Sequence, residues 1–188
     1  AFWIPLPKST DPVAPRILYV NSSLFDADKV NALDVMKVNL MILDILMNED
    51  DNFNVIGHHM FQDVKGLPTG LMLQVTPGFI KKAAACFRRA YPARSKGIHF
   101  INMPSVFETM VRPFLTRKHQ NRIFINSGNN FSNLHKVISP SVLPKECGGT
   151  NGTLDDLIGM HINDLLELKS ADEIHMHYFY IISDFGLK

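Results

Sequence analysis

The stretch "TPGFIKKAAACFRRAYPARSKGIHFIN" (Thr76–Asn102) decides the fold, because an amphipathic helix is followed directly by a strand. Thr76 predicts the N-cap of the helix, and Pro77 stands at the first helical position, where its missing N–H is not needed. "GIHFIN" (Gly97–Asn102) predicts the strand. The apolar stripe of the helix consists of Phe79, Ala83, Cys86, Phe87 and Ala90.

The same alternation occurs upstream. "RILYV" (Arg16–Val20) predicts a strand, and apolar residues recur at helical spacing from Asp26 to Met47, with Asp26 as the N-cap. "FNVIGHHMFQDV" (Phe53–Val64) predicts the next strand. Strands that alternate with helices favour an α/β layered fold with a largely parallel sheet.

Further elements are predicted at the two ends of the chain. Residues 1–15 carry four prolines and predict an extended lead-in. "RIFIN" (Arg122–Asn126) predicts a fourth strand, and two closing helices are expected over Thr153–Leu168 and Ala171–Ile182, the first with Thr153 as its N-cap. A chain of 188 residues is the size of one domain with its own core, so residues 1–188 are expected to form a single domain.

Composition excludes several classes of protein. The net charge of +1 provides no overall field to attract nucleic acid. The longest apolar stretch, Val38–Met47, is too short to span a bilayer, and no signal-peptide pattern opens the chain. Cys86 and Cys147 are expected to be free thiols, which favours a reducing compartment. Three N-x-S/T sequons, at Asn21, Asn130 and Asn151, leave secretion as the alternative.

The histidines do not form a metal-ligand pattern. His58 and His59 are adjacent on a strand, so their side chains point to opposite faces, and His175 and His177 diverge on the last helix. The sequence contains no zinc-binding spacing, phosphate-binding glycine loop or nucleophile elbow. We therefore expect no enzyme, no metal site and no cofactor.

Basic residues occur in two pairs. Arg94 and Lys96 alternate just before a predicted strand, and Lys118 and Arg122 are four residues apart. If the pairs lie apart they are solvated surface charges, and if they converge they form an anion-binding site. Nine methionines and thirteen phenylalanines fit either ordinary core packing or an adaptable apolar pocket.

Four motifs, in order, carry a family resemblance: "TPGFIKK" (Thr76–Lys82), "GIHFINMP" (Gly97–Pro104), "PFLTRK" (Pro113–Lys118) and "LHKVISPSVLPKECGGT" (Leu134–Thr150). Together they resemble the CRAL-TRIO lipid-binding domain family, which includes tocopherol and retinaldehyde carriers and the clavesins. The resemblance runs from Leu6 to Asp156. It implies helices around a mixed, mostly parallel sheet that enclose a hydrophobic cavity.

The resemblance also implies site residues. A gate over Val106–Leu115, anchored by Pro104 and Pro113, would close the cavity, and His58 or Gln62 would hydrogen-bond a ligand hydroxyl or carbonyl. The implied cavity residues are His58, Met60, Gln62, Val75, Ala83, Cys86, Phe87, Tyr91, Ile98, Phe107, Met110 and Phe114. The implied phosphoinositide-binding residues are Arg94, Lys96, Lys118 and Arg122.

The chain departs from the family pattern in several places. The gate is shorter by nearly one helical turn, Cys147 replaces an aromatic residue, and Gln120 stands where a basic residue is common. The N-terminal helical lobe of the family is absent, as in a fragment.

The sequence therefore predicts a cytoplasmic, peripherally membrane-associated protein that transfers a tocopherol, retinoid, carotenoid or other lipid between membranes. The alternatives are a static carrier or pigment-binding protein, an enzyme that uses His58 or His99, and a scaffold with an empty pocket.

Overall fold

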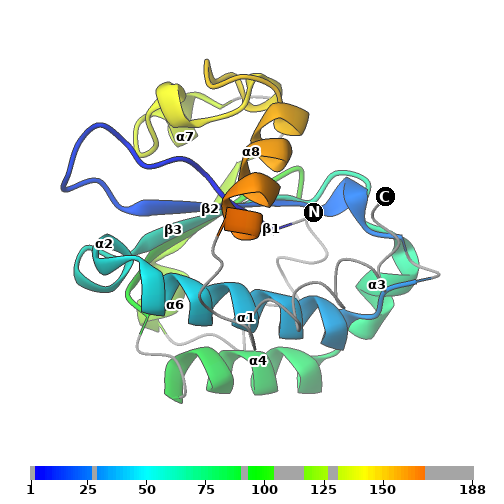
Figure 1. The fold of residues 1–188 in the computed structure, drawn as a ribbon. Helices are drawn as coiled ribbons and strands as arrows, with labels where there is room; N and C mark the ends of the chain where they lie inside the picture. The colour runs from blue at the N-terminus through cyan, green and yellow to red at the C-terminus, as the bar shows by residue number, and fades with distance from the viewer. Residues whose placement is uncertain (1–2, 27–28, 90–92, 104–116, 127–130, 168–188) are drawn as a thin grey trace.

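A five-stranded sheet lies at the centre of the computed structural model, which describes residues 3–26, 29–89, 93–103, 117–126 and 131–167. The strand order is β1-β2-β3-β4-β5, with β1 antiparallel to β2 and the other neighbours parallel (Figure 1). The strands are β1 Trp3–Pro5, β2 Arg16–Asn21, β3 His58–Asp63, β4 Ser95–Ile101 and β5 Ile123–Asn126. The predicted α/β class with a mostly parallel sheet is confirmed.

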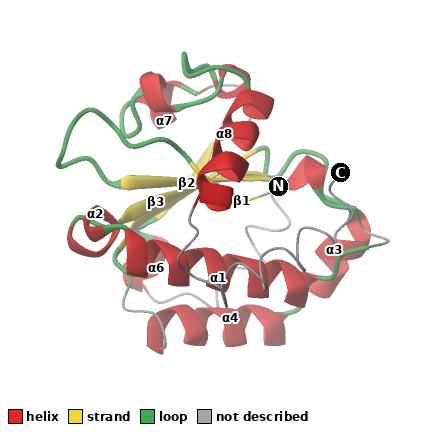
Figure 2. Cartoon of the chain, in the orientation of Figure 1, coloured by secondary structure: helices red, strands yellow, loops and turns green. Residues whose placement is uncertain are grey.

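Helices lie on both sides of this sheet. The longer ones are α1 Ala32–Glu49, α4 Pro77–Arg89 and α8 Leu154–Glu167. Short ones are α2 Asp51–Val55, α3 Thr69–Gln74, α6 Arg117–Gln120 and α7 Ser132–His135, with 3₁₀ turns η1 Ser22–Leu24, η3 Pro140–Val142 and η4 Lys145–Cys147. α1, α3 and α4 are on one side, and α7 and α8 are on the other (Figures 1 and 2).

The alternation of side chains along the strands gives the protein two cores. Leu18 and Val20 of β2 pack with Ile42 of α1 on one face of the sheet. Ile17 and Tyr19 pack with the α8 side on the other face. Because successive side chains of a strand point to opposite faces, a strand buried on both faces is hydrophobic along its buried part, as "ILYV" (Ile17–Val20) is.

The predicted start of the first helix is wrong. α1 begins at Ala32, and Asn31 rather than Asp26 is its N-cap, with Asn31 Oδ1 accepting hydrogen bonds from the N–H groups of Leu33 and Asp34 at 3.0 Å. The carbonyl of Asp26 instead accepts from the N–H groups of Lys29 and Val30 in a separate turn. Both residues satisfy the cap preference, and the apolar spacing does not distinguish between them.

The predicted strand over Phe53–Val64 is wrong in its first part. Asp51–Val55 form α2, where Asp50 Oδ1 accepts from the Phe53 N–H at 3.2 Å. Gly57 then adopts φ +95°, and a Cβ there would lie 2.2 Å from the Arg94 carbonyl oxygen. The chain therefore turns at Gly57, and the strand begins only at His58. A short apolar run predicts a buried helix as well as it predicts a strand.

Both threonine caps are confirmed. The Thr76 hydroxyl accepts from the Phe79 N–H at 3.2 Å, and α4 starts at Pro77. The Thr153 hydroxyl accepts from the Asp156 N–H at 3.2 Å, while Asp156 accepts from the Thr153 N–H at 2.8 Å.

The strands expected at Gly97–Asn102 and Arg122–Asn126 are β4 and β5, shifted by one or two residues. The extended lead-in contains β1, and the helix expected over Ala171–Ile182 lies outside the described residues.

A buried carboxylate joins the lead-in to the main body. Asp50 Oδ2 lies 2.8 Å from Arg16 Nε and 3.6 Å from Lys8 Nζ. The side chain of Asp50 is only 5% exposed and that of Arg16 only 11%. Burial lowers the pKa of the Arg16 guanidinium, and Asp50 opposes that change. Asp50 thus connects the start of β2 to the junction between α1 and α2.

Candidate functional site

A cavity of about 290 Å³ lies between the sheet and helices α1, α3 and α4. The first wall is α1, which contributes Ala32, Val35, Met36 and Asn39. These four residues are spaced i, i+3, i+4 and i+7, so they form one face of the helix. This face is apolar except for Asn39.

The second wall is α4, which contributes Phe79, Ile80, Ala83 and Ala84 at the same kind of spacing. Lys81 and Lys82, between the two pairs, are exposed on the opposite face. The remaining lining comes from the sheet, the lead-in and the region of α3: Trp3, Phe25, Gln62, Val64, Leu67, Leu71, Val75 and Phe100. The described lining therefore contains no charged side chain.

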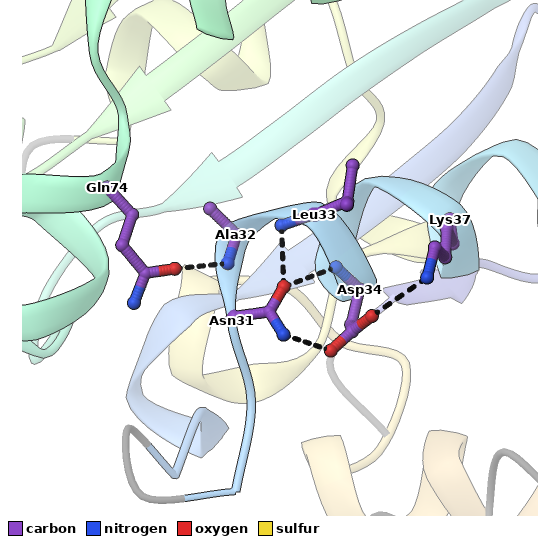
Figure 3. A network of polar contacts seen from close by, with 6 residues as sticks. All are labelled: Asn31, Ala32, Leu33, Asp34, Lys37 and Gln74. Carbon is purple, nitrogen blue, oxygen red and sulfur yellow. Dashed lines mark hydrogen bonds and ion pairs between the residues drawn. The ribbon is translucent and has the colours of Figure 1, made fainter.

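A polar network joins two of the walls (Figure 3). Gln74, the last residue of α3, accepts a hydrogen bond from the Ala32 N–H at 2.8 Å through its side-chain carbonyl. Asn31 accepts from the next two N–H groups of α1, donates through its amide to Asp34, and Asp34 pairs with Lys37 at 3.2 Å. The first three N–H groups of α1, which have no partner within the helix, are thus satisfied, and α3 is held against the start of α1.

Three of the cavity residues expected from the sequence lie in this lining: Gln62, Val75 and Ala83. Met60 and Ile98 share the sheet face of Gln62, because β3 and β4 pair Met60 with Ile98 and Gln62 with Phe100, but they lie outside the lining. Cys86 is half-buried on α4, also outside it. The Phe87 side chain, Tyr91, and the gate with Phe107, Met110 and Phe114 fall outside the described residues.

The structure places His58 away from the cavity. Its ring stacks on Phe53 at a centroid separation of 4.7 Å, and the residue is 4% exposed. Trp3 and Asn39 also line the cavity, and neither was predicted. The helical spacing of Ala32, Val35, Met36 and Asn39 contained a signal for the second of these, whereas nothing in the lead-in distinguished Trp3.

His59 and His99 form a buried pair on the other face of the sheet. Their Nδ1 and Nε2 atoms lie 3.0 Å apart, and His99 stacks on Phe124 at 4.7 Å. Burial, the largest cause, lowers the pKa of both imidazoles, and each also lies near a second basic group: Lys96 for His59, and His59 for His99. The pair is therefore neutral near pH 7. It occurs in a packed interior, apart from the cavity.

Acid is expected to destabilise the protein through these histidines. Burial lowers the pKa of His58 to about 4, and those of His59 and His99 also fall below the usual 6.5. The unfolded chain gains protons as pH falls through 6.5 while the folded protein does not, so stability is lost from pH 6.5 down to about 4. Urea unfolding over this range should show a falling midpoint. The variant His58→Phe should show a smaller fall, and an unchanged slope would contradict the assignment.

Arg122 lies against the start of β4. Arg122 Nη1 donates to the Ser95 carbonyl at 2.6 Å, and the Arg122 carbonyl accepts from the Ile98 N–H at 2.7 Å. The guanidinium thus lies against the backbone between Arg94, which is exposed, and Lys96, which is half-buried. Lys118 belongs to α6, and its side chain is outside the described part. Arg94, Lys96 and Arg122 are called the basic cluster below, and the convergence of their side chains on one anion stays a prediction.

Two features are absent from the part of the chain that the structure describes. No three histidine, cysteine or acidic side chains in them are grouped so as to hold a metal ion. None of their helices is long and apolar enough to cross a bilayer.

The fold and sequence match known proteins. The structure resembles the crystal structure of Sfh5 with a TM-score of 0.58 and 13% sequence identity, over 88% of this chain and 65% of that one. The chain is 30% identical to clavesin-1 of Xenopus laevis over 182 residues, which is 91% of this chain and 54% of the relative. It is 32% identical to human clavesin-2 over 161 residues, 84% of this chain and 48% of that protein. The chain thus spans about half the length of these relatives.

The family model for the CRAL/TRIO domain matches residues 5–149, which include all five strands except the first two residues of β1. The matched residues are most of the chain, and the clavesins agree with them in sequence. The mostly parallel sheet with helices on both sides is the fold shared with Sfh5. This chain therefore belongs to the CRAL/TRIO family.

Proposed function

We propose that residues 1–188 form one lipid-binding domain, which holds a lipophilic small molecule in the cavity and transfers it between membranes without catalysing a reaction. The observation that supports this proposal is the apolar cavity of about 290 Å³ between α1, α3, α4 and the sheet. A cavity of about 150 Å³ lined by apolar residues stays dry and binds benzene. One of twice that volume suits about a dozen carbon atoms, such as a ring system or an isoprenoid segment.

Burial of the ligand provides the affinity. A molecule that buries on the order of 400 Å² of apolar surface gains about 10 kcal/mol, before the loss of its translational and rotational freedom. Retinoids, tocopherols and carotenoids contain ring and isoprenoid parts of this kind and are almost insoluble in water. The proposed role of the cavity is to exclude water from such a part.

The ligand itself is the first test. Protein purified without detergent should yield a stoichiometric lipophile when its organic extract is analysed by mass spectrometry. The variant Ala83→Phe, which places a ring in the cavity, serves as the control and should yield none. Equal recovery of the same compound from both proteins would contradict binding in this cavity.

The second part of the proposal concerns the membrane. The basic cluster and Lys118 would dock on a phosphoinositide headgroup at the cytoplasmic leaflet, as the family resemblance suggests. Each basic residue near an anionic surface contributes about 1 kcal/mol, so four allow reversible docking without permanent anchoring. A protein that transfers its ligand must dock on a membrane in this way, whereas a static carrier does not need to.

Charge reversal should separate docking from ligand binding. We expect Arg94→Glu with Lys96→Glu to slow transfer to vesicles that contain phosphoinositide by at least tenfold, because both cations become anions at the membrane surface. Arg122 is left intact, since its guanidinium bonds to the Ser95 carbonyl. Ligand affinity should stay within about twofold, because neither residue lines the cavity.

The matched control is Lys81→Glu with Lys82→Glu, which changes the net charge equally on the exposed face of α4. This control should transfer as the natural protein does. If both double variants slow transfer equally, the effect is one of net charge and the docking site is wrong. If the natural protein itself transfers nothing to vesicles, the chain is a static carrier.

A further inference from the structure

The cavity takes up only part of the space between the sheet and helices α1 and α4. Both helices begin beside α3, since Gln74 of α3 bonds to the first N–H of α1 and α4 follows α3 in the chain. The described lining is confined to this end of each helix. On α1 it stops at Asn39, although the helix continues to Glu49. On α4 it stops at Ala84, although the helix continues to Arg89.

The strands show the same limit. Gln62 of β3 and Phe100 of β4 are neighbours in the sheet, and both line the cavity. The preceding pair on the same face is Met60 and Ile98, about 7 Å away along the strands, and neither residue belongs to the described lining. The cavity therefore ends between these two pairs.

The Met60 side chain lies on the cavity side of the sheet. It packs against the core that contains Leu18 and Leu43, and the same core contains the cavity residue Leu71. Leu18, which is paired with Met60 in the sheet, and Leu43 are each 1% exposed, whereas Met60 is half-buried. Met60 is therefore packed less tightly than the two leucines beside it at the closed end of the cavity.

Methionine is long and unbranched, so it fills irregular space in front of a strand, and its loss leaves that space open. We propose that Met60 limits the length of the ligand, because its side chain occupies the space into which a longer molecule would extend. The apolar chain that fits contains about twelve carbon atoms, the size that the cavity volume suits. The ligand is then a short isoprenoid or a medium-chain lipid, and not a whole tocopherol or carotenoid. The inference rests on the proposed function, because it specifies the ligand of the same cavity.

A series of straight-chain alcohols from octan-1-ol to hexadecan-1-ol measures the limit by isothermal titration calorimetry. Each methylene group that enters the apolar cavity should tighten binding about fourfold. In the natural protein this gain should stop at about twelve carbon atoms. In Met60→Ala, which removes about three heavy atoms, the gain should continue for about three more carbon atoms. Tetradecan-1-ol should therefore bind Met60→Ala at least tenfold more tightly than it binds the natural protein.

The matched control is Met160→Ala. It makes the same change at a residue that is 53% exposed on α8, on the other side of the sheet (Figure 1), so it should keep the natural limit. A second variant, Met60→Val, removes a smaller part of the side chain and should move the limit by about one or two carbon atoms. This variant provides the measurement if Met60→Ala does not fold.

The outcomes separate the length limit from the cavity itself. If binding to the natural protein continues to tighten through hexadecan-1-ol, or if Met60→Ala and Met160→Ala have the same limit, the role of Met60 is overturned while the cavity remains a lipid site. If no alcohol of the series binds to the natural protein, the ligand cavity is refuted, and the length limit with it.

Discussion

Replacement of Asp50 by alanine is expected to destabilise the protein by about 3–5 kcal/mol, the loss typical of breaking one side of a buried ion pair. The variant leaves the Arg16 guanidinium, 11% exposed, without its carboxylate at 2.8 Å. It also removes the acceptor of the Phe53 N–H in the first turn of α2. The free energy of unfolding, from urea denaturation at pH 7, measures the loss.

Lys8 and Asp51 supply the controls for Asp50. Lys8 is 61% exposed and lies 3.6 Å from the same carboxylate, so Lys8→Ala should lose less than about 1 kcal/mol. Asp51 is the adjacent carboxylate and is exposed, so Asp51→Ala should have a similarly small effect. The pair Arg16→Met with Asp50→Leu should recover only part of the stability, because the Phe53 cap remains lost. A loss below 1 kcal/mol in Asp50→Ala would contradict the buried pair.

Placing a large ring in the cavity should abolish ligand binding. Ala83 lines the cavity and is half-buried on α4, so Ala83→Phe directs a phenyl group into the space that the ligand needs. We expect the affinity for decan-1-ol to fall at least 100-fold. Calorimetric titration measures the affinity, and the thermal midpoint of the free variant should change little, because the ring enters an existing void.

The neighbouring alanine provides a matched control. Ala85 is also half-buried on α4, two positions further along, but it is not part of the cavity lining. Ala85→Phe makes the same change in composition and helix propensity, and it should bind the alcohol within about threefold of the natural protein. Equal losses in Ala83→Phe and Ala85→Phe would show that the helix, and not the cavity, was disturbed.

The fold was predictable from sequence where local signals agree with tertiary structure. Thr76 with Pro77, and Thr153 with Asp156, are caps whose partners lie within the same turn, so the sequence contains the whole interaction. The error over Phe53–Val64 has the opposite origin. Phe53 is fully buried in a core that includes Leu18 and Val20 of β2, and a Cβ at Gly57 would lie against the Arg94 carbonyl oxygen. Neither contact is visible in a local window.

The candidate site was predictable only in part. Gln62, Val75 and Ala83 were reached through the family resemblance, and the structure places them in the cavity lining. Trp3 and Asn39 were not predicted as cavity residues. Whether a buried polar atom has a hydrogen-bond partner depends on all the segments that pack around it. Composition identifies the residue types that can line a cavity, whereas hydrogen-bond satisfaction is a property of the packed chain.

Trp3 is the only tryptophan of the chain, and it lies in the cavity wall. Indole emission excited at the red edge of protein absorption therefore arises from a single position. Its wavelength and intensity respond to the polarity around that ring, so they report occupancy in unlabelled protein. Filling and emptying can thus be followed in real time, during transfer to vesicles, without attaching any dye.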